Sequence, residues 1–339
     1  MNELTKRNEK SDLSSSVSWR GTVGIRIVFM GTPEFAVASL DALVKAGCNI
    51  AGVITAPDKP AGRGMKLNES AVKKYALDNN LKILQPEKLK DPEFLAQLKS
   101  LNADLQIVVA FRMLPEVVWN MPPMGTVNLH GSLLPQYRGA APINWAVING
   151  EKETGVTTFK LKHEIDTGDI LMQESFPIGE NETAGEVHDR MKEVGARVLV
   201  ETVKGLADGT LIERPQTIDD GQQSSMVGGQ SSLLNLAPKL STETCQIDFS
   251  KTVAEVHNLI RGLSPFPGAF TKLEGKIIKI FNSEKEITTV TSKPGEWESD
   301  KKTFLKFACA DGYILLKDVQ LEGKKRMLIE DFLRGYRFA

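Results

Sequence analysis

A run near the N-terminus sets the fold class, and it reads Ile25-Arg26-Ile27-Val28-Phe29-Met30-Gly31-Thr32-Pro33. Its β-branched and apolar residues predict a buried strand, and the pattern from Glu34 to Ala46 predicts a helix after the glycine turn. A strand, a glycine turn and a helix form the opening unit of a doubly wound α/β domain. The turn holds a single glycine, so the glycine fingerprint of a dinucleotide site is absent.

Strands and helices continue to alternate beyond this unit. Further strands are predicted at Asn49–Thr55, Lys82–Leu84 and Asp104–Ala110, and helices at Glu69–Asp78, Pro92–Leu101 and Pro142–Asn149. Asp104–Ala110 is apolar on both faces, which is typical of a central strand in a parallel sheet. We therefore expect an α/β fold with a doubly wound, mostly parallel, Rossmann-like sheet.

Composition divides the chain into four segments. A length of 339 residues favours two domains, and 41% apolar with 25% charged residues is ordinary for a globular protein. Residues 1–24 are rich in Ser and Lys and lack the apolar region of a secretory signal, so we expect a flexible extension. Residues 211–230 are rich in Pro, Gln, Gly and Ser and are expected to be a linker. The remaining segments are a catalytic domain at 25–210 and a second domain at 231–339.

The second domain shows short strand-like runs with glycine punctuation. After a helix at Thr252–Leu263, strands are predicted at Ala269–Lys272, Lys276–Phe281, Thr303–Ala308 and Tyr313–Val319, which suggests a small β-barrel. From Gly228 onward there are 17 Lys and Arg against 14 Asp and Glu, a balance of +3. The clusters Lys324-Lys325-Arg326 and Lys301-Lys302, with Arg334 and Arg337, are candidates for phosphate contacts or for an ordinary mixed-charge surface.

Several classes of protein are disfavoured by the rest of the composition. The net charge of −1 gives no overall basic excess. Cys48, Cys245 and Cys309 are too scattered for a disulfide framework or a metal cluster. The apolar runs are shorter than the roughly 20 residues that span a bilayer. We expect a reduced, cytoplasmic protein with no metal and no membrane partner.

A candidate site lies on the predicted strand that reads Thr126-Val127-Asn128-Leu129-His130. Residues two apart share one face of a strand, so Asn128 and His130 should stand side by side. An amide donor beside an imidazole suits acyl-transfer chemistry. A strand-end histidine that is merely hydrogen-bonded to backbone is an equally good explanation.

A second candidate lies between predicted strands at Gly155–Leu161 and Ile170–Phe176. The intervening loop is longer than a tight turn requires, which suggests a functional loop that carries Asp166. An isolated Asp-Thr-Gly would more simply be an Asx turn. A long helix is predicted at Thr183–Ala207, where Thr183 and Glu186 form a capping-box pattern.

Four motifs, in this order and spacing, resemble the methionyl-tRNA formyltransferase family over residues 25–339. They are Phe29-Met30-Gly31-Thr32-Pro33-Glu34-Phe35-Ala36, Pro57-Asp58-Lys59-Pro60-Ala61-Gly62-Arg63-Gly64, Asn128-Leu129-His130-Gly131-Ser132-Leu133-Leu134-Pro135-Gln136-Tyr137-Arg138-Gly139-Ala140-Ala141-Pro142-Ile143, and Asp166-Thr167-Gly168-Asp169. The second motif, with two prolines and two glycines, is predicted to be an irregular loop. Two departures, Phe111-Arg112 for the usual Tyr-Gly and Lys162-His163-Glu164, leave the catalytic positions intact, although the first could alter the rim of the folate pocket.

The resemblance implies transfer of a formyl group from 10-formyltetrahydrofolate to the amino group of methionine on initiator tRNA, with tetrahydrofolate as product. It implies that Asn128, His130 and Asp166 are catalytic, with Asp166 orienting His130 or holding a water. It implies folate contacts from Ser132, Leu133, Leu134 and Pro135. Arg63 would contact the acceptor stem, and an OB-like barrel with Lys324, Lys325 and Arg326 would bind tRNA. We expect a monomer.

Related activities share the same three catalytic residues. A formyltransferase for a sugar nucleotide or for glycinamide ribonucleotide would pair them with a different second domain or none. A formyltetrahydrofolate hydrolase would use water as the acceptor. An RNA-binding or folate-sensing module without catalysis is the non-enzymatic alternative, although the intact trio argues against it.

Overall fold

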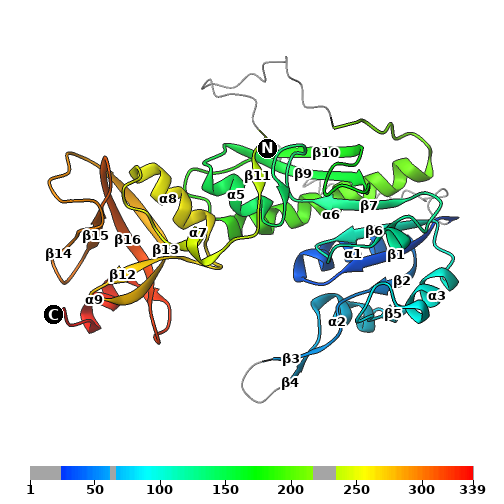
Figure 1. The fold of residues 1–339 in the computed structure, drawn as a ribbon, viewed down its shortest axis with the longest axis horizontal. Coiled ribbons are helices and arrows are strands. Elements are labelled where there is room, and N and C mark those ends of the chain that lie inside the picture. Colours follow the sequence, from blue (N-terminus) through cyan, green and yellow to red (C-terminus); the bar gives the residue numbers. More distant parts are fainter. Residues whose placement is uncertain (1–23, 62–65, 217–233, 339) are drawn as a thin grey trace, which may run out of the picture.

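The computed structural model describes residues 24–61, 66–216 and 234–338. Its two parts lie side by side along the long axis, an α/β sheet with helices and an antiparallel sheet (Figure 1). Within the described ranges, no helix is long and apolar enough to cross a membrane.

The first part is built on a seven-stranded sheet of order β10-β9-β7-β6-β1-β2-β5. β1 pairs in parallel with β2 and β6, and β6 pairs in parallel with β7, whereas β9 and β10 are antiparallel additions at one edge. The predicted mostly parallel sheet is confirmed. The strands are β1 (Arg26–Gly31), β2 (Asn49–Ile54), β5 (Ile83–Leu84), β6 (Leu105–Val109), β7 (Thr126–His130), β9 (Glu153–Lys160) and β10 (Ile170–Pro177).

Alternation along β1 shows why helices cover both faces of this sheet. Ile27 and Phe29 belong to one core with helices α1, α2 and α6, whereas Val28 and Met30 belong to another with α3 and α4. Since successive side chains of a strand point to opposite faces, a run that is apolar throughout needs a layer on each side. These helices are α1 (Glu34–Lys45), α2 (Ala71–Asp78), α3 (Pro92–Ser100), α4 (Glu116–Trp119) and α6 (Ala184–Ala207).

The segment predicted to be an irregular loop instead forms a hairpin, β3 (Lys59–Ala61) with β4 (Lys66–Asn68). Pro60 lies opposite Leu67 in this ribbon. Only alternate residues of an antiparallel pair exchange hydrogen bonds, so an isolated ribbon tolerates a proline that has no N–H. The hairpin projects from the body (Figure 1), and Arg63 lies outside the described residues.

The second part is antiparallel, with strand order β12-β13-β16-β15-β14 and β17 paired with β16. The outer strands β12 and β14 are not bonded to each other among the described residues, so the sheet is a half-barrel around its own core. Its elements are α7 (Thr242–Cys245), α8 (Val253–Gly262), β12 (Ala269–Leu273), β13 (Lys276–Ile287), β14 (Trp297–Ser299), β15 (Leu305–Ala308), β16 (Gly312–Leu321), β17 (Met327–Leu328) and α9 (Ile329–Gly335). The short β14, β17 and α9 were not predicted.

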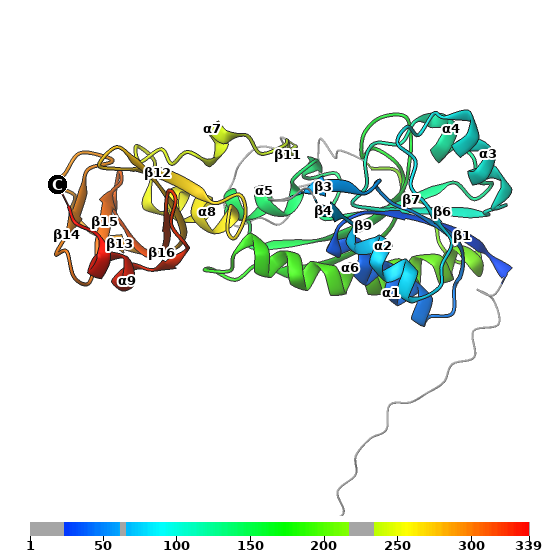
Figure 2. The ribbon, with the colours of Figure 1, turned by 90° about the horizontal axis from the view of Figure 1, so that it is seen from below.

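Polar contacts join the two parts where α5 (Pro142–Ile148) meets α8. Asn144 Nδ2 donates to Gly262 O at 2.8 Å. A side chain at Gly262 would meet Ile148 at 2.5 Å, so glycine permits this close approach. The start of α6 reaches the same region (Figure 2), where Arg261 Nη1 donates to Glu182 O at 3.0 Å.

Candidate active site

Asn128 and His130 lie at the carboxyl end of β7, between β6 and β9. The ladder places Asn128 between Val108 and Phe159. His130 is 7% exposed, and its ring meets Phe159 edge-on at 6.4 Å. The carboxyl end of the central strands is where open α/β sheets bind their ligands.

The His130 ring is hydrogen-bonded to backbone, because its Nε2 lies 2.9 Å from Tyr137 O. A carbonyl oxygen can only accept, so Nε2 must carry the hydrogen and, in the neutral ring, Nδ1 is the basic atom. Tyr137 presents this carbonyl from a left-handed backbone with φ of 60°. A hydrogen bond to backbone was the structural alternative to a catalytic role for His130. The bond to Tyr137 O is present, and it leaves Nδ1 as the nitrogen that is free to act.

Asp166 faces that free nitrogen, with Oδ2 at 3.9 Å from His130 Nδ1. This separation is too long for a direct hydrogen bond, and it suits a small polar group held between the two. Orientation of the ring thus comes from the Tyr137 carbonyl, whereas Asp166 is placed to share a proton donor with it.

The Asp166 loop is held by hydrogen bonds from the backbone of Gly139 and the side chain of Gln216. Its Oδ2 accepts from Gly139 N at 2.9 Å, and its carbonyl accepts from Gln216 Nε2 at 2.9 Å. Asp166 itself has a left-handed φ of 54°. A side chain at Gly168 would lie 1.5 Å from Lys160 O, so this loop requires glycine there.

The stretch Ser132 to Pro135 turns two of its side chains inward. Ser132 is fully buried and its hydroxyl donates to Gln136 O at 2.6 Å. Leu134 is 3% exposed and packs with Phe159. Leu133 and Pro135 keep partly exposed surfaces beside them. Arg112, at the sequence departure, is tied back to the carbonyls of Pro86 and Glu87.

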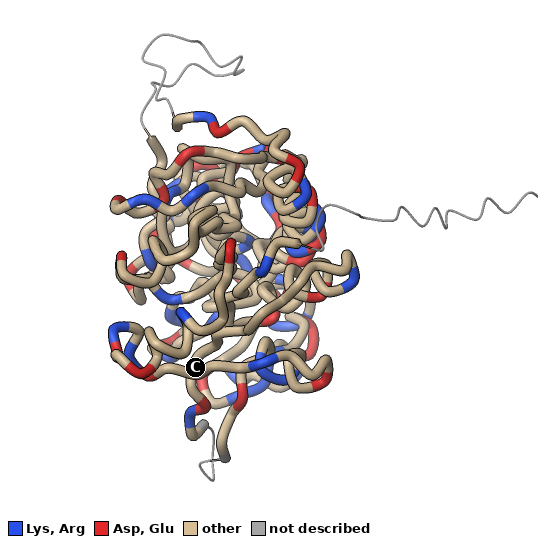
Figure 3. Tube along the Cα trace, turned by 90° about the vertical axis from the view of Figure 1, so that its right-hand side faces the viewer, with Lys and Arg blue, Asp and Glu red and all other residues tan. Residues whose placement is uncertain are grey.

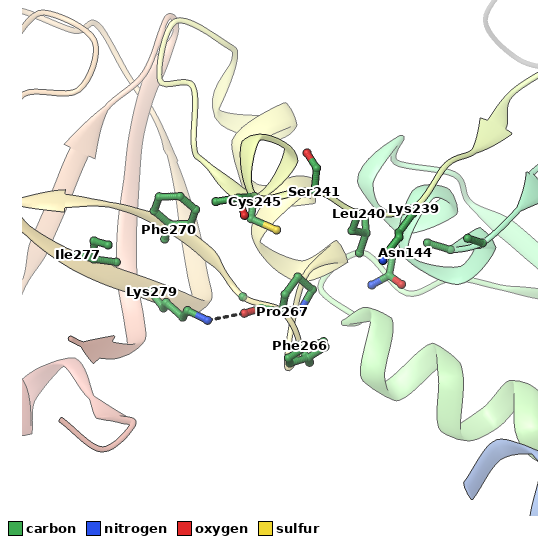
Figure 4. A pocket seen from close by; sticks show the side chains of 14 residues that line it. Asn144, Lys239, Leu240, Ser241, Cys245, Phe266, Pro267, Phe270, Ile277 and Lys279 are labelled. Atoms are coloured by element: carbon green, nitrogen blue, oxygen red, sulfur yellow. Dashed lines mark hydrogen bonds between the residues drawn. The ribbon is translucent and has the colours of Figure 1, made fainter. Parts of the chain in front are cut away.

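A pocket of about 680 Å³ lies between the two parts of the molecule (Figure 4). Ala140 and Ala141 line it from the catalytic part, Lys239 lies beside Asn144, and Lys279 lines it from the second part. Phe266 at its wall is 80% exposed. The trio does not line this pocket, but Ala140 directly follows Gly139, which binds Asp166.

The candidate cations of the second part lie in the turn between β16 and β17. Lys324 and Lys325 are exposed and form no ion pair with any residue that the structure describes. Arg326 is engaged, since its Nη2 lies 2.5 Å from Asp318 Oδ2 and its guanidinium stacks on Phe281. Figure 3 shows basic and acidic positions interspersed rather than separated into two faces.

The other histidines and the cysteines add no further centre. His257 is buried between Ser283 and Asn181, as expected for a structural histidine. The three cysteines are free. Over residues 24–61, 66–216 and 234–338 no group of three His, Cys, Asp or Glu could hold a metal ion.

Sequence reasoning missed two contributors, the Tyr137 carbonyl and Gln216. A backbone carbonyl leaves no mark in the sequence, and Gln216 was assigned to a linker because of its composition. Tyr137 stands in a quoted motif, but motif spacing shows neither the contact of its carbonyl with His130 nor that of Gln216 with the Asp166 loop.

The family described as "Formyl transferase" matches residues 25–203, and "Formyl transferase, C-terminal domain" matches residues 239–337. A methionyl-tRNA formyltransferase from Bacteroides fragilis is 53% identical over 93% of this chain and 96% of its own. Another, from Flavobacterium johnsoniae, is 49% identical over 93% and 97%.

Solved structures share the fold at lower identity. A sugar 3N-formyl transferase, WlaRD, crystallised with dTDP and 5-N-formyl-THF, has a TM-score of 0.62 at 22% identity, over 89% of this chain and 99% of that one. HypX from Aquifex aeolicus, in complex with tetrahydrofolic acid, has a TM-score of 0.60 at 18% identity, over 92% of this chain and 48% of that one.

Proposed function

Because the chain belongs to the methionyl-tRNA formyltransferase family, we propose that it formylates the α-amino group of methionine carried by initiator tRNA. The formyl donor is 10-formyltetrahydrofolate. Relatives that are about half identical over nearly their whole length support the acceptor, and folate-bound neighbours of the same fold are consistent with the donor.

The reaction exchanges one carbon–nitrogen bond for another. The amine nitrogen of methionine bonds to the formyl carbon, and the bond from that carbon to N10 of the folate breaks. The amine loses one proton and N10 gains one, so the neutral reactants give formylmethionyl-tRNA and tetrahydrofolate without net proton release. The chemistry needs a proton relay and a donor for the formyl oxygen.

Asn128 and His130 fit these two tasks. The Asn128 amide donates to the formyl oxygen as negative charge builds there, which typically contributes about 10²–10³ in rate. His130 Nδ1, left free by the Tyr137 carbonyl, receives the amine proton and passes it on. Asp166 Oδ2 lies 3.9 Å from His130 Nδ1, so it can bind the amine or a water that also contacts the imidazole and hold the proton during its transfer. The relative position of His130 and Asp166 is the observation that carries the proposal.

The donor binds against the stretch Ser132 to Pro135. The Ser132 hydroxyl is bonded to Gln136 O and the Leu134 side chain is buried. Leu133, Pro135 and the exposed backbone therefore form the wall of the folate site. Thr157 Oγ1 donates to Ser132 O at 2.7 Å and fixes this wall on β9. No protein nucleophile is required, since the formyl group is already activated on the folate.

The tRNA spans both parts of the chain. The second domain, residues 231–339, binds it with Lys324, Lys325 and Arg326, while Arg63 on the β3–β4 hairpin contacts the acceptor stem. The unpaired 3′ end passes through the pocket between the parts, where Lys239 and Lys279 suit phosphates and Phe266 suits a base. We expect the enzyme to act as a monomer, in the cytoplasm where aminoacyl-tRNA is used.

One assay tests the proposal. Purified protein is incubated with 10-formyltetrahydrofolate and either methionyl initiator tRNA or methionyl elongator tRNA. Formylation of the initiator alone is expected. Release of formate without an acceptor would instead indicate a hydrolase, and transfer to a sugar-nucleotide amine or to glycinamide ribonucleotide would indicate a sister enzyme.

A further inference from the structure

The described residues on either side of segment 217–233 are both fastened to the catalytic loops. Gln216 precedes that segment and contacts the Asp166 loop. Asn235 follows it and contacts Tyr137, whose carbonyl holds His130. The connection between the two parts of the molecule therefore begins and ends on the loops that carry the reaction.

Gln216 uses its side-chain amide fully. Its Oε1 accepts from Arg138 Nε at 3.1 Å and from Arg138 Nη2 at 2.6 Å. Its Nε2 donates to Asp166 O at 2.9 Å and to Gly168 O at 2.8 Å. A side-chain amide has two donor hydrogens and one acceptor oxygen, so only glutamine and the shorter asparagine carry the groups that this set of bonds requires.

The two carbonyls that Gln216 holds belong to a strained turn. Asp166 adopts a left-handed backbone, which is unfavourable for most residues with a side chain. Such a conformation persists only when the surroundings enforce it. With Gly139 N on the carboxylate and Gln216 on the carbonyl, Asp166 is fixed at both its side chain and its backbone.

Asn235 holds the backbone around Tyr137, whose carbonyl contacts His130. Its carbonyl accepts from Tyr137 N at 2.6 Å, and its own N–H donates to Gln136 Oε1 at 2.8 Å. Tyr137, like Asp166, is a non-glycine residue in the left-handed backbone conformation. The left-handed turns at Asp166 and at Tyr137 are thus each held by a residue that flanks segment 217–233, and the groups that they position, Asp166 Oδ2 and His130 Nδ1, lie 3.9 Å apart.

We infer that Gln216 is a positioning residue for formyl transfer, which together with Asn235 sets the separation of Asp166 and His130. The inference rests on the proposed function for its kinetic readout. It assigns the two described residues that flank segment 217–233 a part in the reaction geometry. Without the Nε2 donor, the Asp166 turn relaxes away from Nδ1 while the substrate-binding surfaces stay intact.

Gln216→Glu is the sharpest variant, because it keeps an oxygen for Arg138 but loses the donor to the two carbonyls. Gln216→Met, which is neutral and of similar length, removes the same donor without adding charge. Gln97→Glu on α3 is the matched control, since that glutamine is exposed and distant from the site. Each full-length variant is assayed for initiator tRNA formylation under saturating and limiting tRNA.

We expect both Gln216 variants to lower kcat by about 10- to 100-fold, since an ångström of misplacement can cost that much. The KM for the tRNA should stay within about 2-fold of wild type, because uniform binding is untouched. Gln97→Glu should leave both constants unchanged. A second readout, the ¹⁵N spectrum of labelled histidine, should show the His130 signals moved and those of buried His257 unmoved in the Gln216 variants.

Wild-type kcat in both Gln216 variants, or a raised KM with unchanged kcat, would overturn the inference. Loss of the His257 signals would mark a variant as unfolded, and the other variant then decides. If the wild-type protein forms no formylmethionyl-tRNA, the proposed function fails. The spectrum then still decides the inference, because an unmoved His130 in the Gln216 variants would refute it.

Discussion

The end of β7 and the turn between β16 and β17 use polar residues in opposite ways. At β7, the imidazole and the carboxylate of the proposed trio are each held by backbone, through Tyr137 O and Gly139 N. At the turn, Lys324 and Lys325 extend into solvent. Chemistry depends on positions fixed within fractions of an ångström, whereas contacts to phosphates tolerate movement because the Coulomb attraction changes slowly with distance. Hydrogen bonds therefore fix the polar groups at the proposed reaction site, whereas the lysines of the turn are left exposed.

The largest expected effect on activity is at the end of β7, where polar groups are held by hydrogen bonds. Asn128→Ala should lower kcat by about 10²–10³, the usual cost of losing one donor to a developing oxyanion. Single-turnover formylation with saturating folate and tRNA measures it. The exposed Asn79→Ala is the control and should keep full activity. A fall of less than 3-fold for Asn128→Ala would remove this residue from the transition state.

His257 tests whether fixed polar groups also occur in the second part. Burial, together with the nearby charges of Lys285 and Arg261 and against that of Glu180, lowers the pKa of His257 to about 4. In the unfolded chain a histidine takes up its proton near pH 6.5. The folded state is therefore fully stable above pH 6.5 and loses stability as the pH falls toward 4.

The loss approaches about 3 kcal/mol at the acid end of that window, at 1.36 kcal/mol per pKa unit. Urea unfolding at pH 7 and pH 5, compared with His257→Gln, isolates this contribution. Glutamine can still bond to Ser283 and Asn181 but does not titrate. An identical pH dependence in both proteins would show that His257 is protonated without penalty.

Phe266 lies between the two extremes, as an exposed ring on the wall of a pocket. Stacking of one base on an aromatic ring contributes about 1–3 kcal/mol. Phe266→Ala should therefore raise the KM for tRNA by about 10-fold with little change in kcat, and Phe266→Trp should restore it. A drop in kcat at unchanged KM would place the 3′ end elsewhere.

The smallest effect is expected at the exposed turn between β16 and β17. The double variant Lys324→Ala, Lys325→Ala should raise KM only a few-fold and flatten the slope of log affinity against log salt by about 1 to 2. Titrations of tRNA from low to high salt give this slope. The exposed pair Lys88 and Lys90 provides a control with the same change of charge. An unchanged slope would exclude the turn from the tRNA contact.

Much of this fold follows from periodicity in the sequence. The β-branched run at β1 predicted a strand, the run at Asp104–Ala110 predicted a strand that is apolar on both faces, and the pattern at Thr183 and Glu186 predicted the observed capping box of α6. The hairpin β3–β4 was missed because proline and glycine content signals a turn but does not reveal a short ribbon.

The site was less accessible from sequence than the sheet was. Motifs singled out Asn128, His130 and Asp166, and alternation placed the first two on one face. They could not show that the Ser132 hydroxyl is internally bonded or that a carbonyl selects the nitrogen of His130. Those features depend on loops whose backbone angles, such as the left-handed Tyr137, are set by distant residues.

Helix α6 has a mechanical consequence for the enzyme. Its first turn meets the second part, where Gly185 N donates to Ser264 O at 3.0 Å, and further along Gly195 packs closely on Leu129 of β7. At 1.5 Å per residue, its 24 residues form a rod of about 36 Å. Gly195 lies ten residues, or about 15 Å, beyond Gly185, so each degree of tilt about the first turn displaces the contact with β7 by roughly 0.3 Å. A tilt of α6 at the second part would therefore shift its contact with the strand that carries Asn128 and His130.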